Sequence, residues 1–242
     1  MQPVILSAFT FISTLLGGIF ALRHNKDNLH RILGYTAGVL LGVVAFDLLP
    51  EIFNLLTAQH ISSTGPMIAL VTGFLLFHII EKSLLIHHSQ EEEYTLHHHP
   101  QVGVASAVAL IGHSFLDGVG IGLGFQAGTS VGVAVAIAVI AHDFTDGLNT
   151  VNLMLVNQNK PKQALKFLIV DAIAPVLGAA STLIFQLSDA GLVIYLGFFA
   201  GFLLYIGASE ILPEAHSQHS SYWTIGLTVS GALSIFIITR FI

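Results

Sequence analysis

Residues 104–124 read VASAVALIGHSFLDGVGIGLG, a run that contains no Lys or Arg and a single acidic residue, Asp117. A run of this length can cross the roughly 30 Å hydrocarbon core of a bilayer as one helix, which takes about 20 mostly apolar residues. His113 and Asp117 lie in its middle, four positions apart, so they project from the same helix face. The run therefore indicates a membrane protein with a polar site between its spans.

The composition of the whole chain supports this interpretation. Lys, Arg, Asp and Glu make up only 9% of the 242 residues, hydrophobic residues make up 54%, and the mean hydropathy is +0.80. A soluble domain needs roughly a quarter of its residues charged, so the soluble class is excluded. The chain has no cysteine, which excludes disulfides and thiolate metal sites and leaves His and carboxylates as the strong ligands. The lipid bilayer is the expected surrounding, and no nucleic-acid partner is expected.

Eight stretches are long and apolar enough to be predicted as transmembrane helices. They lie near residues 3–22, 31–54, 66–86, 101–125, 130–156, 164–187, 190–215 and 222–241. We therefore expect an all-α integral membrane protein with eight transmembrane helices, in which residues 1–242 form a single transmembrane domain.

The positive charges predict the orientation of these helices. Seven Lys and Arg residues fall on one side of the predicted spans, and only Arg240 falls on the other. Because short basic loops stay in the cytoplasm, both termini are expected outside the cytoplasm. The His/Glu-rich connection at 87–100 then faces the cytoplasm, as a solvated linker or as a loose metal buffer. The compact chain favours a prokaryotic inner (plasma) membrane.

The central motif occurs twice. His113-Ser-Phe-Leu-Asp117-Gly in the fourth span matches His142-Asp-Phe-Thr-Asp146-Gly in the fifth. At about 1.5 Å per residue, both copies lie near the middle of the membrane. Asp143, three residues before Asp146, flanks the same helix face. We expect the two imidazoles and three carboxylates to converge at the midplane.

The energetic cost of these buried carboxylates predicts a visiting cation. An ionised Asp at the centre of a membrane helix costs about 2.5–3.5 kcal/mol, and no Lys or Arg lies at this depth in any predicted span. A divalent metal is the natural counter-ion, and protonated carboxylates hydrogen-bonded to the helix backbones are the alternative. Imidazole combined with carboxylate suits zinc, iron, manganese or cobalt.

A second repeated motif lies in the second and seventh spans. Asp47-Leu-Leu-Pro-Glu51 matches Glu210-Ile-Leu-Pro-Glu214, and His216 lies beside the second copy. Each proline leaves a backbone carbonyl without its helical donor, so each motif offers a carbonyl and two carboxylates. We interpret these residues as relay points on a transport path, and simple helix-end kinks are the alternative.

Together the two repeated motifs predict an inverted repeat, because the matching spans run in opposite directions through the membrane. The layout becomes three helices, a central pair and three helices, which is typical of secondary transporters. Asp171, in the middle of the sixth span near Pro175, is a further candidate ligand.

These motifs resemble those of the ZIP (Zrt/Irt-like) family of divalent metal transporters, and the resemblance covers nearly the whole chain. It implies import of Zn²⁺ or related metals, usually by a homodimer, through a central site that is often binuclear. Many members carry Glu before the proline of the sixth helix and Asn in the fourth, where this chain has Ala174 and Ser114. Either Asp171 replaces the missing carboxylate, or the site holds one metal. The first option builds a second metal position from Ser114, Asp143, Asp146 and Asp171.

The leading hypothesis is an importer that moves divalent metal into the cytoplasm through the central His/Asp site by alternating access. Zinc is the first candidate, followed by iron, manganese, cadmium and cobalt. An intramembrane zinc-dependent hydrolase, in which the same ligands activate a water, is the alternative, and a metal sensor without flux is a third possibility. The inverted repeat and the acids near both faces favour the importer, so the metal is expected as transported substrate, with no cofactor and no enzymatic activity.

Overall fold

The fold of the chain is built from helices that follow the apolar stretches of the sequence. The computed structural model describes residues 2–22, 29–92, 100–217 and 221–240, and no strand occurs among them. The helices are α1 (Gln2–Leu22), α2 (Leu29–Val43), α3 (Leu49–Ala58), α4 (Thr64–Glu92), α5 (Pro100–Ala127), α6 (Thr129–Val156), α7 (Pro161–Ser181), α8 (Asp189–Tyr205), α9 (Leu212–Ala215) and α10 (Tyr222–Ile238). A 3₁₀ turn, Thr182–Ile184, extends α7.

Two π-helical segments join helices into longer rods. Val44–Leu48 connects α2 to α3, and Ile206–Ile211 connects α8 to α9. At the end of each segment a backbone N–H donates to the carbonyl five residues earlier, Leu49 to Val44 and Leu212 to Gly207. The proline that follows each segment has no N–H to donate, and the wider turn rearranges the hydrogen bonds just before it.

The helices show that this is an all-α integral membrane protein. Six helical stretches of the described chain are long and apolar enough to cross a membrane: Gln2–Leu22, His30–Ala58, Gly103–Ala127, Thr129–Val156, Pro161–Ile184 and Asp189–Ala215. Two shorter apolar helices, Thr64–Ile80 and Tyr222–Ile238, accompany them. Each of the eight predicted ranges overlaps one of these helical stretches.

Three predicted boundaries are wrong. The second range was expected to end near residue 54, but α3 continues to Ala58. The sixth range was expected to continue to residue 187, but the helix ends at Ile184 and Phe185 is extended, where the chain turns toward α8. The connection at 87–100 was expected to be a loop from its first residue, but α4 continues through residue 92. At about 1.5 Å per residue, 29 residues span roughly 44 Å, so the polar end of α4 reaches beyond a bilayer core. Residues 93–99 of the predicted loop lie outside the described residues.

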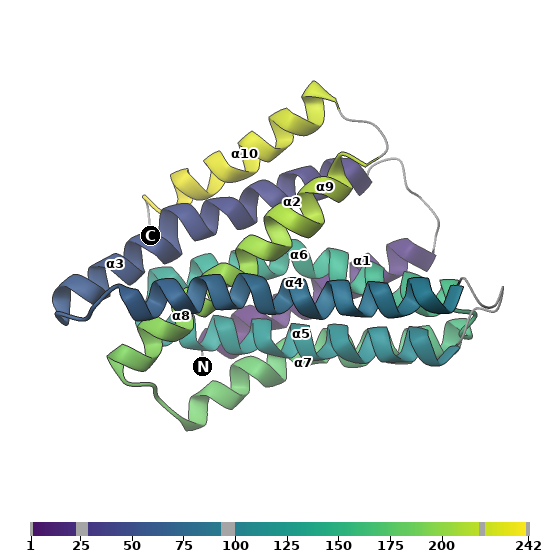
Figure 1. Ribbon diagram of the computed structural model, residues 1–242, viewed down its shortest axis with the longest axis horizontal. Helices are drawn as coiled ribbons and strands as arrows, with labels where there is room; N and C mark the ends of the chain where they lie inside the picture. Colours follow the sequence, from purple (N-terminus) through teal and green to yellow (C-terminus); the bar gives the residue numbers. More distant parts are fainter. Residues whose placement is uncertain (1, 23–28, 93–99, 218–220, 241–242) are drawn as a thin grey trace.

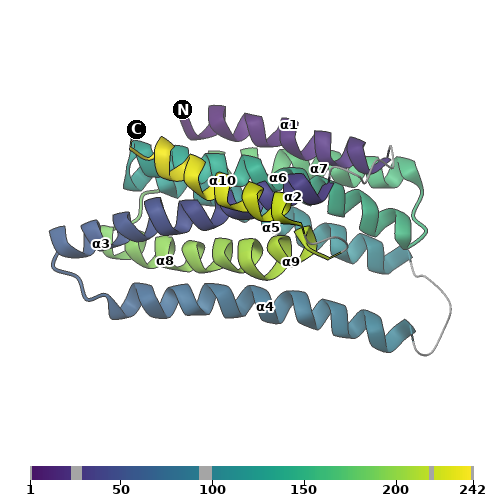
Figure 2. The same ribbon diagram turned by 90° about the horizontal axis from the view of Figure 1, so that it is seen from above.

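The helices pack as two groups. Helices α1, α5, α6 and α7 pack against one another, while α10 packs on α2 and α4 packs on α8. Figure 1 shows α10 lying along α2, and Figure 2 shows α1 and α4 at opposite edges of the bundle. We call α1, α5, α6 and α7 the first group and α2, α4, α8 and α10, with their π segments, the second group. The hydrophobic core where the two groups meet includes Leu40 and Val44 from the second group and Val139 of α6 in the first. The central motifs therefore lie inside the first group, next to α8.

Candidate metal centre

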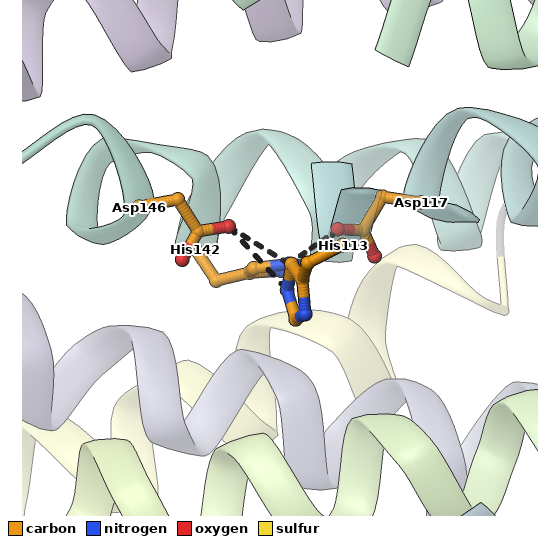
Figure 3. A group of neighbouring side chains, drawn as sticks. All are labelled: His113, Asp117, His142 and Asp146. Atoms are coloured by element: carbon orange, nitrogen blue, oxygen red, sulfur yellow. Dashed lines mark ion pairs between the residues drawn. The ribbon is translucent and has the colours of Figure 1, made fainter. Parts of the chain in front are cut away.

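The antiparallel helices α5 and α6 bring four polar side chains together. The imidazole Nε2 of His113 lies 3.3 Å from Asp117 Oδ2 and 3.5 Å from Asp146 Oδ2. The Nε2 of His142 lies 3.4 Å from the same oxygen of Asp117 and 3.8 Å from that of Asp146. Figure 3 shows both imidazoles between the two carboxylates. Each helix thus contributes one imidazole and one carboxylate to a single cluster.

The four side chains of this cluster are buried without hydrogen-bond partners for their facing atoms. Asp117 and His142 have fully buried side chains, and the side chains of Asp146 and His113 are 8% and 14% exposed. His113 Nε2, His142 Nε2, Asp117 Oδ2 and Asp146 Oδ2 form no hydrogen bond. One ligand atom from each residue lies within 4.8 Å of the others. Two imidazole nitrogens and two carboxylate oxygens are a donor set that zinc accepts in a tetrahedral site.

Neighbouring groups hold both imidazoles with Nε2 toward the cluster. The Nδ1 of His142 lies 2.9 Å from the backbone carbonyl oxygen of Ala138. A hydrogen bond from Nδ1–H fixes the ring and leaves Nε2 as the metal-facing acceptor, as in most metal-bound histidines. The His113 ring packs edge-on against Phe202 of α8 and Phe77 of α4, at 4.8 and 6.0 Å between centroids. These rings limit water beside His113.

Asp143 lies at the edge of the cluster. Its Oδ1 is 3.9 Å from His142 Nε2 and has no hydrogen-bond partner. Its Oδ2 accepts a 3.4 Å hydrogen bond from the Thr14 hydroxyl of α1. Asp143 is therefore positioned between the four-residue cluster and helix α1.

Ser114 and Asp171 face one another instead of the cluster. The Ser114 hydroxyl donates to Asp171 Oδ1 at 2.7 Å, and the Thr150 hydroxyl donates to Asp171 Oδ2 at 2.8 Å. All three residues are buried. The sequence analysis did not predict the two threonines that donate to buried carboxylates, Thr150 to Asp171 and Thr14 to Asp143. Thr150 could have been found, because it follows Asp146 by four residues and shares its helix face. Nothing in the sequence near Thr14 signals its partner on α6.

The residues predicted along a transport path lie in the two π-helical rods. Asp47 falls in the first π segment with its buried Oδ2 unpaired, and Glu51 follows one turn later. Glu210 falls in the second π segment. Glu214 is exposed in α9, and its backbone carbonyl accepts a hydrogen bond from the Ser217 hydroxyl. His216, directly after α9, is half-buried. None of the five belongs to the four-residue cluster found among the described residues.

Comparison with known proteins identifies the family of the chain. The sequence model of the ZIP zinc transporter family matches residues 87–239, which is more than half of the chain. The chain is also 29% identical over 246 residues to the zinc transporter ZupT of Streptococcus mutans serotype c (strain ATCC 700610 / UA159), covering 95% of this chain and 93% of that protein. These matches confirm the resemblance inferred from the motifs, and they indicate a metal transporter in place of a hydrolase. The chain therefore belongs to the ZIP family of zinc transporters.

Proposed function

We propose that this protein imports divalent metal into the cytoplasm, with zinc as its first substrate and iron, manganese, cadmium and cobalt as further candidates. The observation that carries the proposal is the buried cluster of two imidazoles and two carboxylates whose facing atoms have no hydrogen-bond partners. His113, Asp117, His142 and Asp146 are the proposed ligands, and Oδ1 of Asp143 lies near enough to assist. The proposal is supported by the name of the bacterial relative, a zinc transporter.

Matching glycine contacts support a 3+2+3 inverted repeat. A Cβ at Gly17 of α1 would overlap the carbonyl oxygen of Phe144 in α6, and a Cβ at Gly178 of α7 would overlap that of Phe115 in α5. Phe115 and Phe144 occupy the same place in the two copies of the central motif. Helix α1 therefore contacts α6 in the manner that α7 contacts α5.

The outer helices repeat this relation. A Cβ at Gly38 of α2 would overlap the carbonyl oxygen of Thr228 in α10, and a Cβ at Gly201 of α8 would overlap that of Leu70 in α4. Gly38 and Gly201 each lie nine residues before the acidic residue that opens the second repeated motif. The two π segments also match in position. We infer that all eight helical rods cross the membrane and that residues 1–242 form one transporter domain.

The inverted repeat gives the proposed transport cycle its two related gates. Metal would enter past Asp47 and Glu51, lose water at the central ligands, and leave past Glu210, Glu214 and His216 as the protein alternates between outward-open and inward-open states. The charge distribution supports termini outside the cytoplasm. A bacterial relative supports the plasma membrane as the location, and we propose a homodimer as the assembled form.

Zinc flux into proteoliposomes tests the proposed function. Purified protein is reconstituted around a zinc-sensitive fluorophore, and the initial rate is compared between the unmodified protein and His113→Ala. The matched control is His60→Asn, an exposed histidine in a turn whose positive φ of 53° Asn tolerates. We expect His113→Ala to abolish nearly all flux and His60→Asn to retain it. Near-normal flux in His113→Ala would overturn the proposal.

A further inference from the structure

The carboxylates around the candidate metal centre differ in what their oxygens contact. In Asp117 neither oxygen has a hydrogen-bond partner, and in Asp146 the oxygen facing the imidazoles has none. Both oxygens of Asp171 accept short hydrogen bonds from hydroxyl groups, at 2.7 and 2.8 Å, although this side chain is also fully buried. Asp171 thus has a protein donor for each oxygen, whereas the facing oxygens of Asp117 and Asp146 have no hydrogen-bond donor and lie only beside the two imidazoles.

The hydrogen bonds of Asp171 connect three helices at the level of the ligands. Asp171 belongs to α7, and its donors belong to α5 and α6. Ser114 directly follows His113, and Thr150 lies one turn after Asp146. The bonds therefore help to fix how α5 and α6 are rotated about their axes relative to α7, together with the close α5–α7 packing at Gly118 and Gly178.

A second metal beside Asp171 would find few further ligands. Zinc is bound by thiolate, imidazole and carboxylate groups, and neither Ser114 nor Ala174 supplies one of these. Asp143 has one unpartnered oxygen, Oδ1, which lies 3.9 Å from His142 Nε2 of the four-residue cluster, while its Oδ2 accepts a hydrogen bond from Thr14 of α1. The buried methyl group of Ala174 lies on the same helix as Asp171.

We infer that the centre binds a single metal ion. Asp171 is then a positioning residue, held by Ser114 and Thr150, and not a ligand to a second ion. This inference rests on the proposed function, because it specifies how many ions the proposed site carries. Loss of a group that orients metal ligands typically weakens metal affinity about 10–100-fold while leaving the ligand set intact. Loss of a ligand to a second ion would instead lower the number of bound ions.

Counting ions separates these two roles. The starting protein is the full chain with the five loop histidines replaced by alanine, which removes loop binding: His87, His88, His97, His98 and His99. Zinc per chain is measured by elemental mass spectrometry after equilibrium dialysis. We expect the count to fall by one when His113→Ala and His142→Ala are added, and to stay the same when Asp171→Asn is added. X-ray absorption should show no second metal at about 3.5–4 Å, the separation of two-metal sites.

A matched pair of variants at Thr150 tests the positioning role through a side chain whose hydroxyl donates to Asp171. Thr150→Val keeps the shape and removes the hydroxyl, whereas Thr150→Ser keeps the hydroxyl. We expect Thr150→Val to weaken zinc affinity about tenfold, at the lower end of such effects, and to alter the visible absorption spectrum of bound Co²⁺, with the ion count unchanged. Thr150→Ser should restore affinity and spectrum.

Three results would overturn different parts of the reasoning. A count that falls by one in Asp171→Asn, or a metal–metal distance in the absorption data, would make Asp171 a ligand of a second ion. Unchanged zinc affinity and Co²⁺ spectrum in Thr150→Val, with only thermal stability lowered, would reduce the contact to a structural one. A count unaffected by loss of both imidazoles would overturn the proposed function itself.

Discussion

Replacing Asp117 by Asn should shift the metal-free and the metal-bound protein in opposite directions. Oδ2 of Asp117 lies 3.3 and 3.4 Å from the two imidazole nitrogens, and the side chain is fully buried. Neither of its oxygens has a hydrogen-bond partner. An ionised Asp at the centre of a membrane helix costs about 2.5–3.5 kcal/mol. The isosteric Asn removes the charge and keeps the volume, so the metal-free variant should be at least as stable as the original protein.

Zinc binding should weaken in the Asp117→Asn variant by an amount set by the cost of burying the ionised carboxylate. In the unmodified protein, a bound ion neutralises the Asp117 carboxylate and so removes the free-energy cost of burying its charge. The Asn variant has no such charge, so zinc binding gains nothing from neutralising it. At 1.4 kcal/mol per factor of ten, about 2.5–3.5 kcal/mol corresponds to roughly 60–300-fold weaker zinc affinity. The two imidazoles already offset part of the cost of burying the Asp117 charge when no metal is bound. The roughly 60–300-fold loss of zinc affinity is therefore an upper limit for the electrostatic contribution.

Thermal unfolding followed by circular dichroism, with and without zinc, measures the stability of the Asp117→Asn variant. Titration against a zinc-chelating dye measures its zinc affinity. Asp189→Asn is the control, because Asp189 is an exposed acid in the first turn of α8. It should retain zinc affinity. A metal-free Asp117→Asn protein that melts well below the original, together with unchanged zinc affinity, would refute the electrostatic reasoning.

Three further predictions concern pH, packing and orientation. Zinc uptake in proteoliposomes should fall as the medium becomes acidic, since protons compete for imidazole and carboxylate ligands; a flat profile would contradict this. Gly118→Ala should lower stability in thermal melts by roughly 1–3 kcal/mol, because its Cβ would overlap the Pro175 carbonyl oxygen, whereas Gly112→Ala, with no neighbouring atom within 4 Å, should not. The chain lacks cysteine, so Ser62→Cys should react with an impermeant maleimide on intact cells and Ser217→Cys should not; the reverse pattern would invert the orientation.

The helical fold could be predicted because hydropathy and length are local properties. Each span needs about 20 apolar residues regardless of its neighbours, and each predicted range falls on a helical stretch. The boundary errors arose where the apolar stretch and the helix end at different residues. Residues 87–92 are too polar for lipid, but they continue α4 as helix. The π segments at Val44–Leu48 and Ile206–Ile211 were not predicted, although the prolines that follow them mark where the hydrogen bonding is disturbed.

The candidate site could be predicted in part for the same physical reason. Spacing of four residues places His113 beside Asp117, and His142 beside Asp146, and the structure brings both pairs together. Spacing along one helix does not reveal a partner on another helix. The hydroxyls that hold Asp143 and Asp171 come from α1, α5 and α6, and they depend on how these helices are rotated against one another.

The most direct test of the central claim is the anomalous scattering of zinc in crystals of the protein. We predict a peak between α5 and α6 at about 2.0–2.2 Å from the Nε2 atoms of His113 and His142 and from carboxylate oxygens of Asp117 and Asp146. A strong peak elsewhere on the chain, with no density among these four side chains in zinc-saturated crystals, would contradict the claim that the buried carboxylates are there to receive a divalent metal.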